Sequence, residues 1–257
     1  MNERNCCVCF RRLCTALGVS ALALVGFLLL LGLHPHPALA DPDDLFVEQD
    51  GAGNCSQATP CSLQTALGSA TNGDTIYVAA GIYTSTGAAV VTVTQNIILY
   101  GGWDGFPTGP VVRDPDAHPT TLDGENARRG VYISGDITPT LDGLMIIQGD
   151  ASATPDAGRG GGIYSDGGSP IIVGNVISSN VGSTLSTTKG YGGGLYLANV
   201  PHTAVIDDNV FLYNTAAISY YGYGGGIYCD GTALIEHNWL EQNRASVGWT
   251  GYGGAWS

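Results

Sequence analysis

A glycine-rich heptapeptide recurs at nearly regular intervals in the second half of the chain. It reads GRGGGIY from Gly158, GYGGGLY from Gly190, GYGGGIY from Gly222 and GYGGAWS from Gly251, so the copies begin 32, 32 and 29 residues apart. Periods of this length are typical of arrays in which each repeat stacks on its neighbours. The chain is therefore expected to form a solenoid of similar coils.

A nine-residue template follows each of the first three glycine boxes, at residues 172–180, 206–214 and 235–243. It begins with Ile, carries Asn at its fourth and ninth positions, and has a second large apolar residue at its sixth. The two apolar positions are expected to face a core, and the variable polar positions to face outward. Because an Asn lies between the apolar positions, we expect a bend at that Asn, a residue that tolerates left-handed backbone.

Stacking of the coils would place the template asparagines about 4.8 Å apart, a spacing that allows a hydrogen-bonded ladder. The predicted ladder residues are Asn175, Asn209, Asn238, Asn180, Asn214 and Asn243. The glycine boxes are expected to supply tight turns and close approach of neighbouring coils. A phosphate-binding loop is disfavoured, because no Lys-Ser/Thr pair, G-x-G-x-x-G spacing or helix pattern accompanies the boxes.

The first forty residues have the layout of a secretory signal peptide. Three arginines precede an apolar run, and the small residues Ala38 and Ala40 precede a polar DPDD segment, so we expect cleavage after Ala40. A retained single-span anchor is the alternative, since the run is nearly long enough to cross a bilayer. The remaining chain divides into a predicted N-terminal cap segment, residues 41–72, and β-helix coils, residues 73–257.

Charge and cysteine content limit the possible partners and the compartment. Residues 41–257 keep six basic and 21 acidic residues, so nucleic acid and anionic lipid are poor partners. The disfavoured phosphate-binding loop also argues against a nucleotide. An exported protein can keep a disulfide, and Cys55 and Cys61 are the expected pair; Cys229 is expected to be a small buried residue. A short amphipathic helix is predicted within residues 62–70 and would cap the first coil.

Several motifs resemble known families. The order GGGIY followed by FLYN (residues 211–214) is similar to the paired repeats of chlamydial-type polymorphic outer membrane proteins, although Gly stands where that family usually has Ala. The segments PCSLQTAL, GDTIYVAAGIYT and two copies of TLDG resemble the opening of secreted proteins of the pectate-lyase-like superfamily. The resemblance implies an all-β, right-handed parallel β-helix. That fold hosts polysaccharide lyases and hydrolases as well as adhesins and other surface proteins, so it does not select an activity.

Candidate catalytic side chains occupy outward template positions. Asp207, Asp208, Glu236 and His237 are the weak candidates, with Glu236 expected one coil after Asp207 and His237 one coil after Asp208. A solvated acidic face is the competing interpretation. Asp114 and Asp116 are weak calcium candidates in a proline-rich stretch; no other cofactor or metal is expected.

Tyr191, Tyr223 and Tyr252 occupy equivalent places in successive glycine boxes. These tyrosines either support the turns by packing on one another or grip sugar rings.

The sequence thus favours an exported, secreted or cell-surface β-helix protein for adhesion or surface display, with a glycan or protein as its partner. Membrane contact is expected only through the signal segment or a missing C-terminal anchor. The last glycine box begins a coil that the residues up to Ser257 do not complete, so we expect a fragment. The alternative is a polysaccharide lyase or glycoside hydrolase that acts on acidic polysaccharide.

Overall fold

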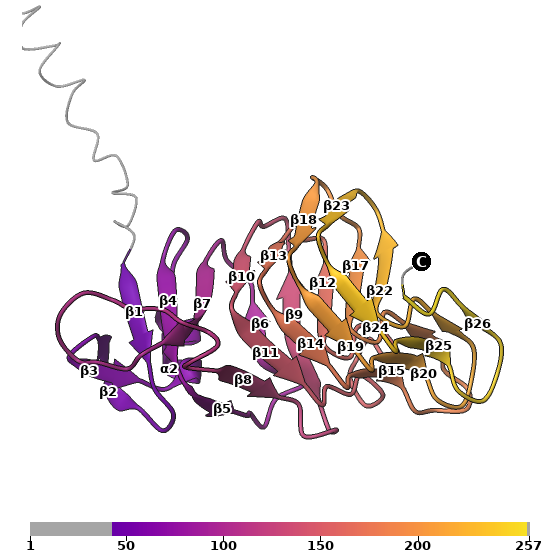
Figure 1. Cartoon of the computed structure of the whole chain (residues 1–257), viewed down its shortest axis with the longest axis horizontal. Coiled ribbons are helices and arrows are strands. Elements are labelled where there is room, and N and C mark those ends of the chain that lie inside the picture. Colours follow the sequence, from indigo (N-terminus) through magenta and orange to yellow (C-terminus); the bar gives the residue numbers. More distant parts are fainter. Residues whose placement is uncertain (1–42, 256–257) are drawn as a thin grey trace, which may run out of the picture. The chain divides into compact units, whose positions relative to one another are not determined.

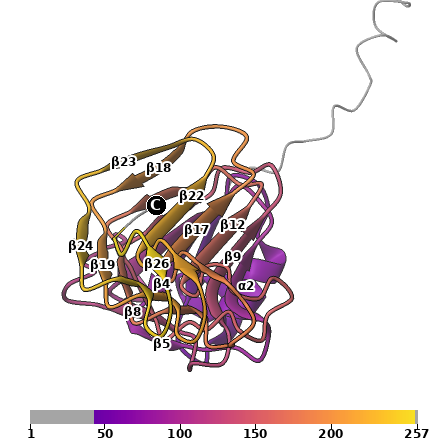
Figure 2. The same cartoon turned by 90° about the vertical axis from the view of Figure 1, so that its right-hand side faces the viewer.

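The computed structural model describes residues 43–255, which form short parallel strands in successive coils (Figure 1). The predicted signal peptide, residues 1–40, lies outside the described residues. Three main sheets surround a shared interior, as the view in Figure 2 shows. The predicted fold class, an all-β parallel β-helix, is confirmed.

Sheet 1 has nine strands and sheet 2 has six. The strands of sheet 1, in pairing order, are β2 (Ala52–Ser56), β3 (Thr59–Cys61), β1 (Asp44–Val47), β4 (Thr75–Ala79), β7 (Ile98–Trp103), β10 (Thr140–Asp142), β13 (Ile171–Val173), β18 (Ala204–Asp207) and β23 (Ala233–Glu236). Those of sheet 2 are β24 (Trp239–Glu241), β19 (Val210–Leu212), β14 (Val176–Ser178), β11 (Leu144–Ile147), β8 (Thr120–Asp123) and β5 (Gly81–Tyr83).

Sheet 3 has five strands, and two smaller sheets of three strands each complete the later coils. Sheet 3 contains β22 (Ile227–Asp230), β17 (Leu195–Ala198), β12 (Ile163–Asp166), β9 (Arg129–Ser134) and β6 (Ala89–Val93). Sheet 4 contains β15 (Val181–Ser183), β20 (Thr215–Ala217) and β25 (Arg244–Ser246), and sheet 5 contains β16 (Gly190–Tyr191), β21 (Gly222–Tyr223) and β26 (Gly251–Tyr252).

The core consists of rows of apolar side chains that repeat from coil to coil. In sheet 1, Leu141, Ile172 and Ile206 stand in register and are fully buried, and in sheet 2 Ile177 pairs with Phe211 in the same way. Both apolar positions of the template therefore face the interior, as predicted. Burial of one such side chain contributes about 1.5–3 kcal/mol, so repetition through the coils provides the main stabilisation of the fold.

The first coil begins earlier than the sequence indicated. Strand β1 pairs in parallel with β4 along its whole length, Asp44 opposite Thr75 and Val47 opposite Val78, so sheet 1 already includes Asp44, before the predicted start of the coils at residue 73. The segment expected to be only a cap thus supplies a strand of its own. Phe46 on β1 lies opposite Tyr77 on β4, and their rings stack on each other.

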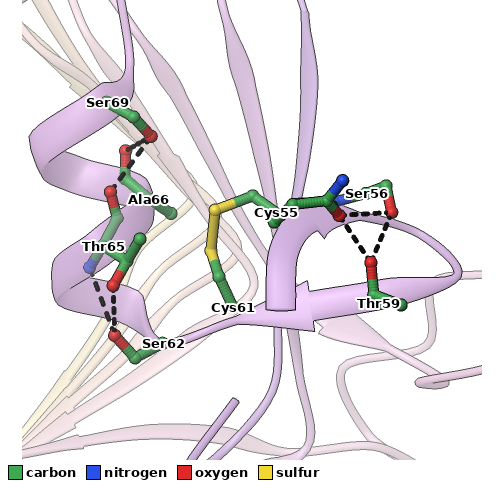
Figure 3. The surroundings of a disulfide bond; sticks show 9 residues. Cys55, Ser56, Thr59, Cys61, Ser62, Thr65, Ala66 and Ser69 are labelled. Atoms are coloured by element: carbon green, nitrogen blue, oxygen red, sulfur yellow. Dashed lines mark hydrogen bonds between the residues drawn. A yellow bond between two sulfur atoms is a disulfide. The ribbon is translucent and has the colours of Figure 1, made fainter. Parts of the chain in front are cut away.

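The predicted helix is present as α2 (Leu63–Ser69), the only helix in the part of the chain that the structure describes. Ser62 caps it, since the Ser62 hydroxyl accepts a hydrogen bond from the backbone N–H of Thr65 at 3.2 Å (Figure 3). Leu63 and Ala66 are buried in the same core cluster as the rows of sheet 1. The helix thus covers apolar surface of the first coils.

Cys55 and Cys61 form a disulfide that joins β2 to the end of β3, immediately before α2 (Figure 3). Both cysteines are buried. The turn of the same hairpin is attached to the long insertion between β7 and β8, because the Gln57 side-chain amide donates to the carbonyl oxygens of Phe106 and Gly109 at 3.1 and 3.2 Å. The start of the fold is therefore held by a covalent link and by contacts to a distant loop.

The glycine boxes place backbone against backbone. A Cβ atom on Gly193 would lie 2.4 Å from the carbonyl carbon of Thr215 in the next coil, a distance that no larger residue can tolerate. The preceding Gly192 has a φ of +55°, in the left-handed region. These two features match the predicted roles of close approach and tight turning. The boxes that start at Gly190 and Gly222 also pair directly, as β16 and β21.

The bends between sheets 1 and 2 fall one residue before the predicted position. Asp208 and His237 have φ values of +52° and +51°, and Gly174 has +64° at the equivalent place, whereas the asparagines that follow them are not among the residues with positive φ. The expectation that Asn itself takes the left-handed conformation is wrong. The Asn side chain points inward instead, where it satisfies the backbone groups that the bend exposes.

Candidate functional site

The asparagines stand in two columns, one at each bend of the template. Asn175, Asn209 and Asn238 form the first column: the Nδ2 of each of the first two donates to the Oδ1 of the next at 3.0 Å. The second column contains Asn180, Asn214 and Asn243, joined in the same way at 3.0 and 2.9 Å.

Each column also caps the backbone of the coils. Asn175 Nδ2 donates to the carbonyl oxygens of Leu141 and Val173, at 3.0 and 2.9 Å. Since Asn175 and Asn209 are almost completely buried, these contacts replace water at the bends. The role of the columns is structural, and they position the outward side chains beside them.

Asp207, Asp208, Glu236 and His237 gather at one bend, and we call them the acidic corner. Asp207 and Glu236 are direct neighbours in register on β18 and β23. Asp208 and His237 occupy equivalent bend positions in the same two coils. The His237 side chain turns toward Asp207 rather than toward Asp208: its Nδ1 lies 2.8 Å from Asp207 Oδ1.

The acidic corner is open to water. The side chain of His237 is 74% exposed and that of Asp207 40% exposed. The hydrogen bond that the Asp207 carboxylate accepts from His237, together with the negative charge of Asp207, raises the pKa of His237 above its usual value. A hollow of about 410 Å³ touches Glu236 and His237, but its other lining residues, Ala233, Ile235, Asn238 and Leu240, occupy the positions that face the interior in the preceding coil. The arrangement can hold and exchange a proton, but its carboxylates are solvated.

The calcium candidates Asp114 and Asp116 lie in the insertion between β7 and β8. One oxygen of the Asp114 carboxylate accepts hydrogen bonds from the backbone N–H groups of Asp116 and Ala117, at 3.2 and 3.0 Å. Asp114 thereby stabilises a local turn. The insertion is anchored by Arg113, whose Nη2 lies 2.8 Å from Asp142 Oδ1 and whose guanidinium stacks on Tyr100.

The box tyrosines Tyr191, Tyr223 and Tyr252 stack face to face, with centroid separations of 5.1 and 5.2 Å. A second row on the outer side of sheet 3 includes Tyr196 and Tyr228, and Tyr191 contacts Tyr228 edge to face at 5.2 Å. Both rows pack on each other, so the faces of most rings are occupied by other rings. The structure therefore brings the predicted stack together in a supporting role, with Tyr252 the most exposed member.

A buried arginine that the sequence did not single out organises the first box. Arg129 is 2% exposed, and its guanidinium donates to the carbonyl oxygens of Arg159 and Gly160 and to the hydroxyl of Thr154. Burial lowers the pKa of Arg129 to about 10. Its contacts are almost all to backbone oxygens, which indicates that it fixes the loop rather than binds a ligand.

Cys229 lies half-buried against the core, opposite Leu197 in register. Burial raises the pKa of its thiol. This environment disfavours the reactive thiolate, although Cys229 is half-buried rather than buried as expected.

A second surface, which the sequence pattern did not indicate, lies where sheet 4 passes into sheet 5. Three successive loops stand side by side there, at residues 184–189, 218–221 and 247–250, beside β25 and β26 in Figure 1. We call their side chains and the adjoining box tyrosines the loop edge. Its apolar and aromatic members are Leu185, Ile218, Tyr220, Tyr221, Val247, Trp249, Tyr191, Tyr223 and Tyr252.

The loop edge is built by contacts between coils. The backbone N–H of Gly248 donates to the carbonyl of Ile218 at 2.9 Å, and the Ser246 hydroxyl donates to the carbonyl of Tyr220 at 2.8 Å. The ring of Trp249 packs on Tyr220 and Tyr221 with centroids 5.8 and 5.6 Å apart. These aromatic side chains are therefore held in place by the stack of coils.

The comparisons with known proteins give no assignment. No family model matches the chain, and searches of curated proteins and of solved structures also give no match. Within residues 43–255, no helix has the length and apolar character needed to cross a membrane, and no three His, Cys, Asp or Glu side chains gather as a metal-binding group. Two regions of the described surface stand out by composition: the acidic corner and the loop edge.

Proposed function

We propose that this chain is an exported protein of the cell surface or extracellular space that works by adhesion, with the β-helix as a scaffold for display. The observation that supports this proposal is the loop edge, where Leu185 is 42%, Ile218 38% and Trp249 58% exposed, one on each of its three successive loops. Exposed aromatic side chains held on a rigid framework are a common basis of recognition. The resemblance of the repeats to those of polymorphic outer membrane proteins agrees with this assignment.

The rigidity of the scaffold matters for adhesion because ordering of loops on binding costs free energy. Loops that are already hydrogen-bonded to the next coil, as Gly248 is to Ile218, lose little conformational freedom when a ligand binds. A binding surface of this kind can retain affinity with few contacts.

Adhesion is tested with beads that carry the secreted protein and with layers of cultured cells. We expect saturable attachment that soluble protein competes away. Beads that carry a Trp249→Ala variant should attach less, whereas beads with Trp239→Ala, a slightly more exposed tryptophan on sheet 2, should attach like the wild type. Attachment no better than that of uncoated beads would refute the proposal.

The alternative function is polysaccharide cleavage at the acidic corner. The observation in its favour is the hydrogen bond of 2.8 Å between His237 and Asp207, with Glu236 in register beside Asp207. An enzyme of this kind would release reducing ends or unsaturated sugars from acidic polysaccharide, and Asp207→Ala and Glu236→Ala would each abolish that release. Product that forms equally with the wild type and both variants would exclude the acidic corner as its source.

A further inference from the structure

The loop edge differs from the rest of the chain in charge. Residues 183–199, 213–229 and 242–255, which contain its three loops and boxes, include no Asp or Glu, although residues 41–257 contain 21 acidic side chains. The charged residues in these three segments are Lys189 and Arg244, both exposed. The Lys189 ammonium lies 5.9 Å from the centre of the Tyr223 ring, where the aromatic face attracts it.

The hydrogen-bonding groups of the loop edge are neutral. Between the aromatic side chains the loops expose hydroxyl groups, which both donate and accept hydrogen bonds. They belong to the exposed Thr184, Ser186, Thr187 and Thr250 and to the half-buried Ser219. Tyrosine, serine and glycine in combination give a surface that offers flat apolar faces and adaptable polar contacts together.

The dimensions of the loop edge favour a narrow ligand. Three loops one coil apart span two intervals of about 4.8 Å, and thus about 10 Å along the stack. A stable protein interface covers roughly 800 Å² on each partner, whereas the loop edge extends only about 10 Å along the stack. An extended chain of sugar rings, by contrast, can lie along such a strip and place its apolar ring faces on Trp249 and Tyr252 and its hydroxyl groups on those of the loops.

We propose that the loop edge binds a neutral glycan chain, a proposal that rests on the adhesive function and specifies its ligand. Sugar rings offer apolar C–H faces and hydroxyl groups, which match the aromatic rings and hydroxyl groups of the loop edge. A polyanionic glycan is disfavoured, because the acidic residues elsewhere on the chain repel it at a distance and only Lys189 and Arg244 attract it locally. A neutral glycan chain is neither repelled by the acidic residues nor attracted by the two basic ones.

The direct test is titration of the secreted protein with soluble neutral polysaccharides (a β-glucan, a galactomannan and a xyloglucan) and with polygalacturonate as the acidic probe. We expect saturable binding of at least one neutral polysaccharide. Its dissociation constant should change by less than about twofold between about 0.05 M and about 0.5 M salt, because screening acts on charges alone. Tighter binding of polygalacturonate than of every neutral probe would overturn the proposal, as would binding of none of them.

Variants locate the site. Trp249→Ala, and separately Tyr220→Ala, should weaken binding of the neutral polysaccharide about tenfold, equivalent to about 1.4 kcal/mol. Trp239→Ala and Tyr213→Ala are the matched controls, since Trp239 is 63% and Tyr213 51% exposed on other faces of the same coils. Equal losses in the variants and controls would overturn the proposal. Circular dichroism of each variant verifies that the coils remain folded.

The bead assay separates the two proposals. If Trp249→Ala reduces attachment to cells while no neutral polysaccharide binds, adhesion through the loop edge stands and the glycan assignment fails. If a neutral polysaccharide binds through Trp249 while wild-type beads do not attach to cells, the glycan site stands and the adhesive function fails. Inhibition of attachment by the polysaccharide that binds best would support both.

Discussion

Removal of one buried asparagine tests how much the hydrogen bonds of the asparagine columns stabilise the coils. The Asn209 side chain accepts hydrogen bonds from the backbone N–H and the Nδ2 of Asn175, both at 3.0 Å, and donates to Ile172, Asp207 and Asn238 at 2.8, 2.9 and 3.0 Å. Asn209→Ala removes all five contacts. It leaves the Asn175 backbone N–H without a partner in a part of the interior that water does not reach.

The expected loss of stability follows from the number of hydrogen bonds removed. Three contacts share the two hydrogen atoms of Nδ2, so the side chain accounts for about four full hydrogen bonds at about 1 kcal/mol each, and we expect a loss of about 4 kcal/mol. Asn238→Ala is the matched control. Asn238 has a similar set of partners, including the Asn209 backbone N–H at 2.9 Å and the Ile206 carbonyl at 2.7 Å, but it is only half-buried. Water can take over its bonds, so we expect a loss of about 1–2 kcal/mol.

Unfolding in guanidinium chloride, followed by circular dichroism, measures both variants against the wild type. The expected result is a much lower midpoint for Asn209→Ala and a smaller decrease for Asn238→Ala. Equal decreases would show that burial does not set the cost. A change below about 0.5 kcal/mol for Asn209→Ala, the range of ordinary surface substitutions, would refute the structural role of the column.

Three further predictions concern the ends and corners of the fold. Cys61→Ser should lower stability by about 2 kcal/mol because it opens the short disulfide loop, and a reductant should lower the melting temperature of the wild type but not of the variant. Gly174→Ala should lower stability by about 1 kcal/mol because the position has a φ of +64°; the new Cβ itself meets no atom closer than 3.8 Å. Asp208→Gly at the equivalent position of the next coil should raise stability for the same reason. Denaturant midpoints that move in the opposite directions would contradict this. Because its pKa is raised in the folded protein, His237 stabilises the fold at pH values below its unfolded pKa, and this contribution is lost as pH rises through the folded pKa. An NMR titration of His237 should give a lower midpoint in Asp207→Asn, and an unchanged midpoint would show that Asp207 is not the cause.

The sequence was sufficient to predict the interior because every coil has to satisfy the same constraint. Ile172 and Ile206 occupy one position in successive coils and both are fully buried, so a template that recurs three times reveals which side of the strand faces inward. The predicted asparagine ladder rested on the same logic. An asparagine that donates a hydrogen bond to the equivalent asparagine of the next coil requires Asn at the same position in both coils.

The bends were misplaced because composition is ambiguous there. Asn at the fourth template position suited a left-handed residue, yet Gly174, Asp208 and His237 before it take that conformation. Gly, Asp and His are all residue types that adopt positive φ more readily than most, but so is the Asn that follows them, so residue preference did not separate the two positions. The cost of positive φ in Asp208 and His237 is offset by the hydrogen bonds of the asparagine that follows, which only the structure reveals.

The loop edge escaped prediction for a related reason, and the two exposed tryptophans show why composition alone does not find a binding surface. Trp239 is slightly more exposed than Trp249, at 63% against 58%, so hydrophobic exposure alone would rank Trp239 first. Trp239, however, stands on β24 with its indole N–H bonded to the Glu241 carboxylate at 3.1 Å. Trp249 packs on Tyr220 and belongs to a stretch without carboxylates. A ligand that approaches Trp239 has to displace or tolerate a solvated charge, whereas Trp249 presents its ring among neutral groups. Surroundings rather than exposure therefore select the loop edge.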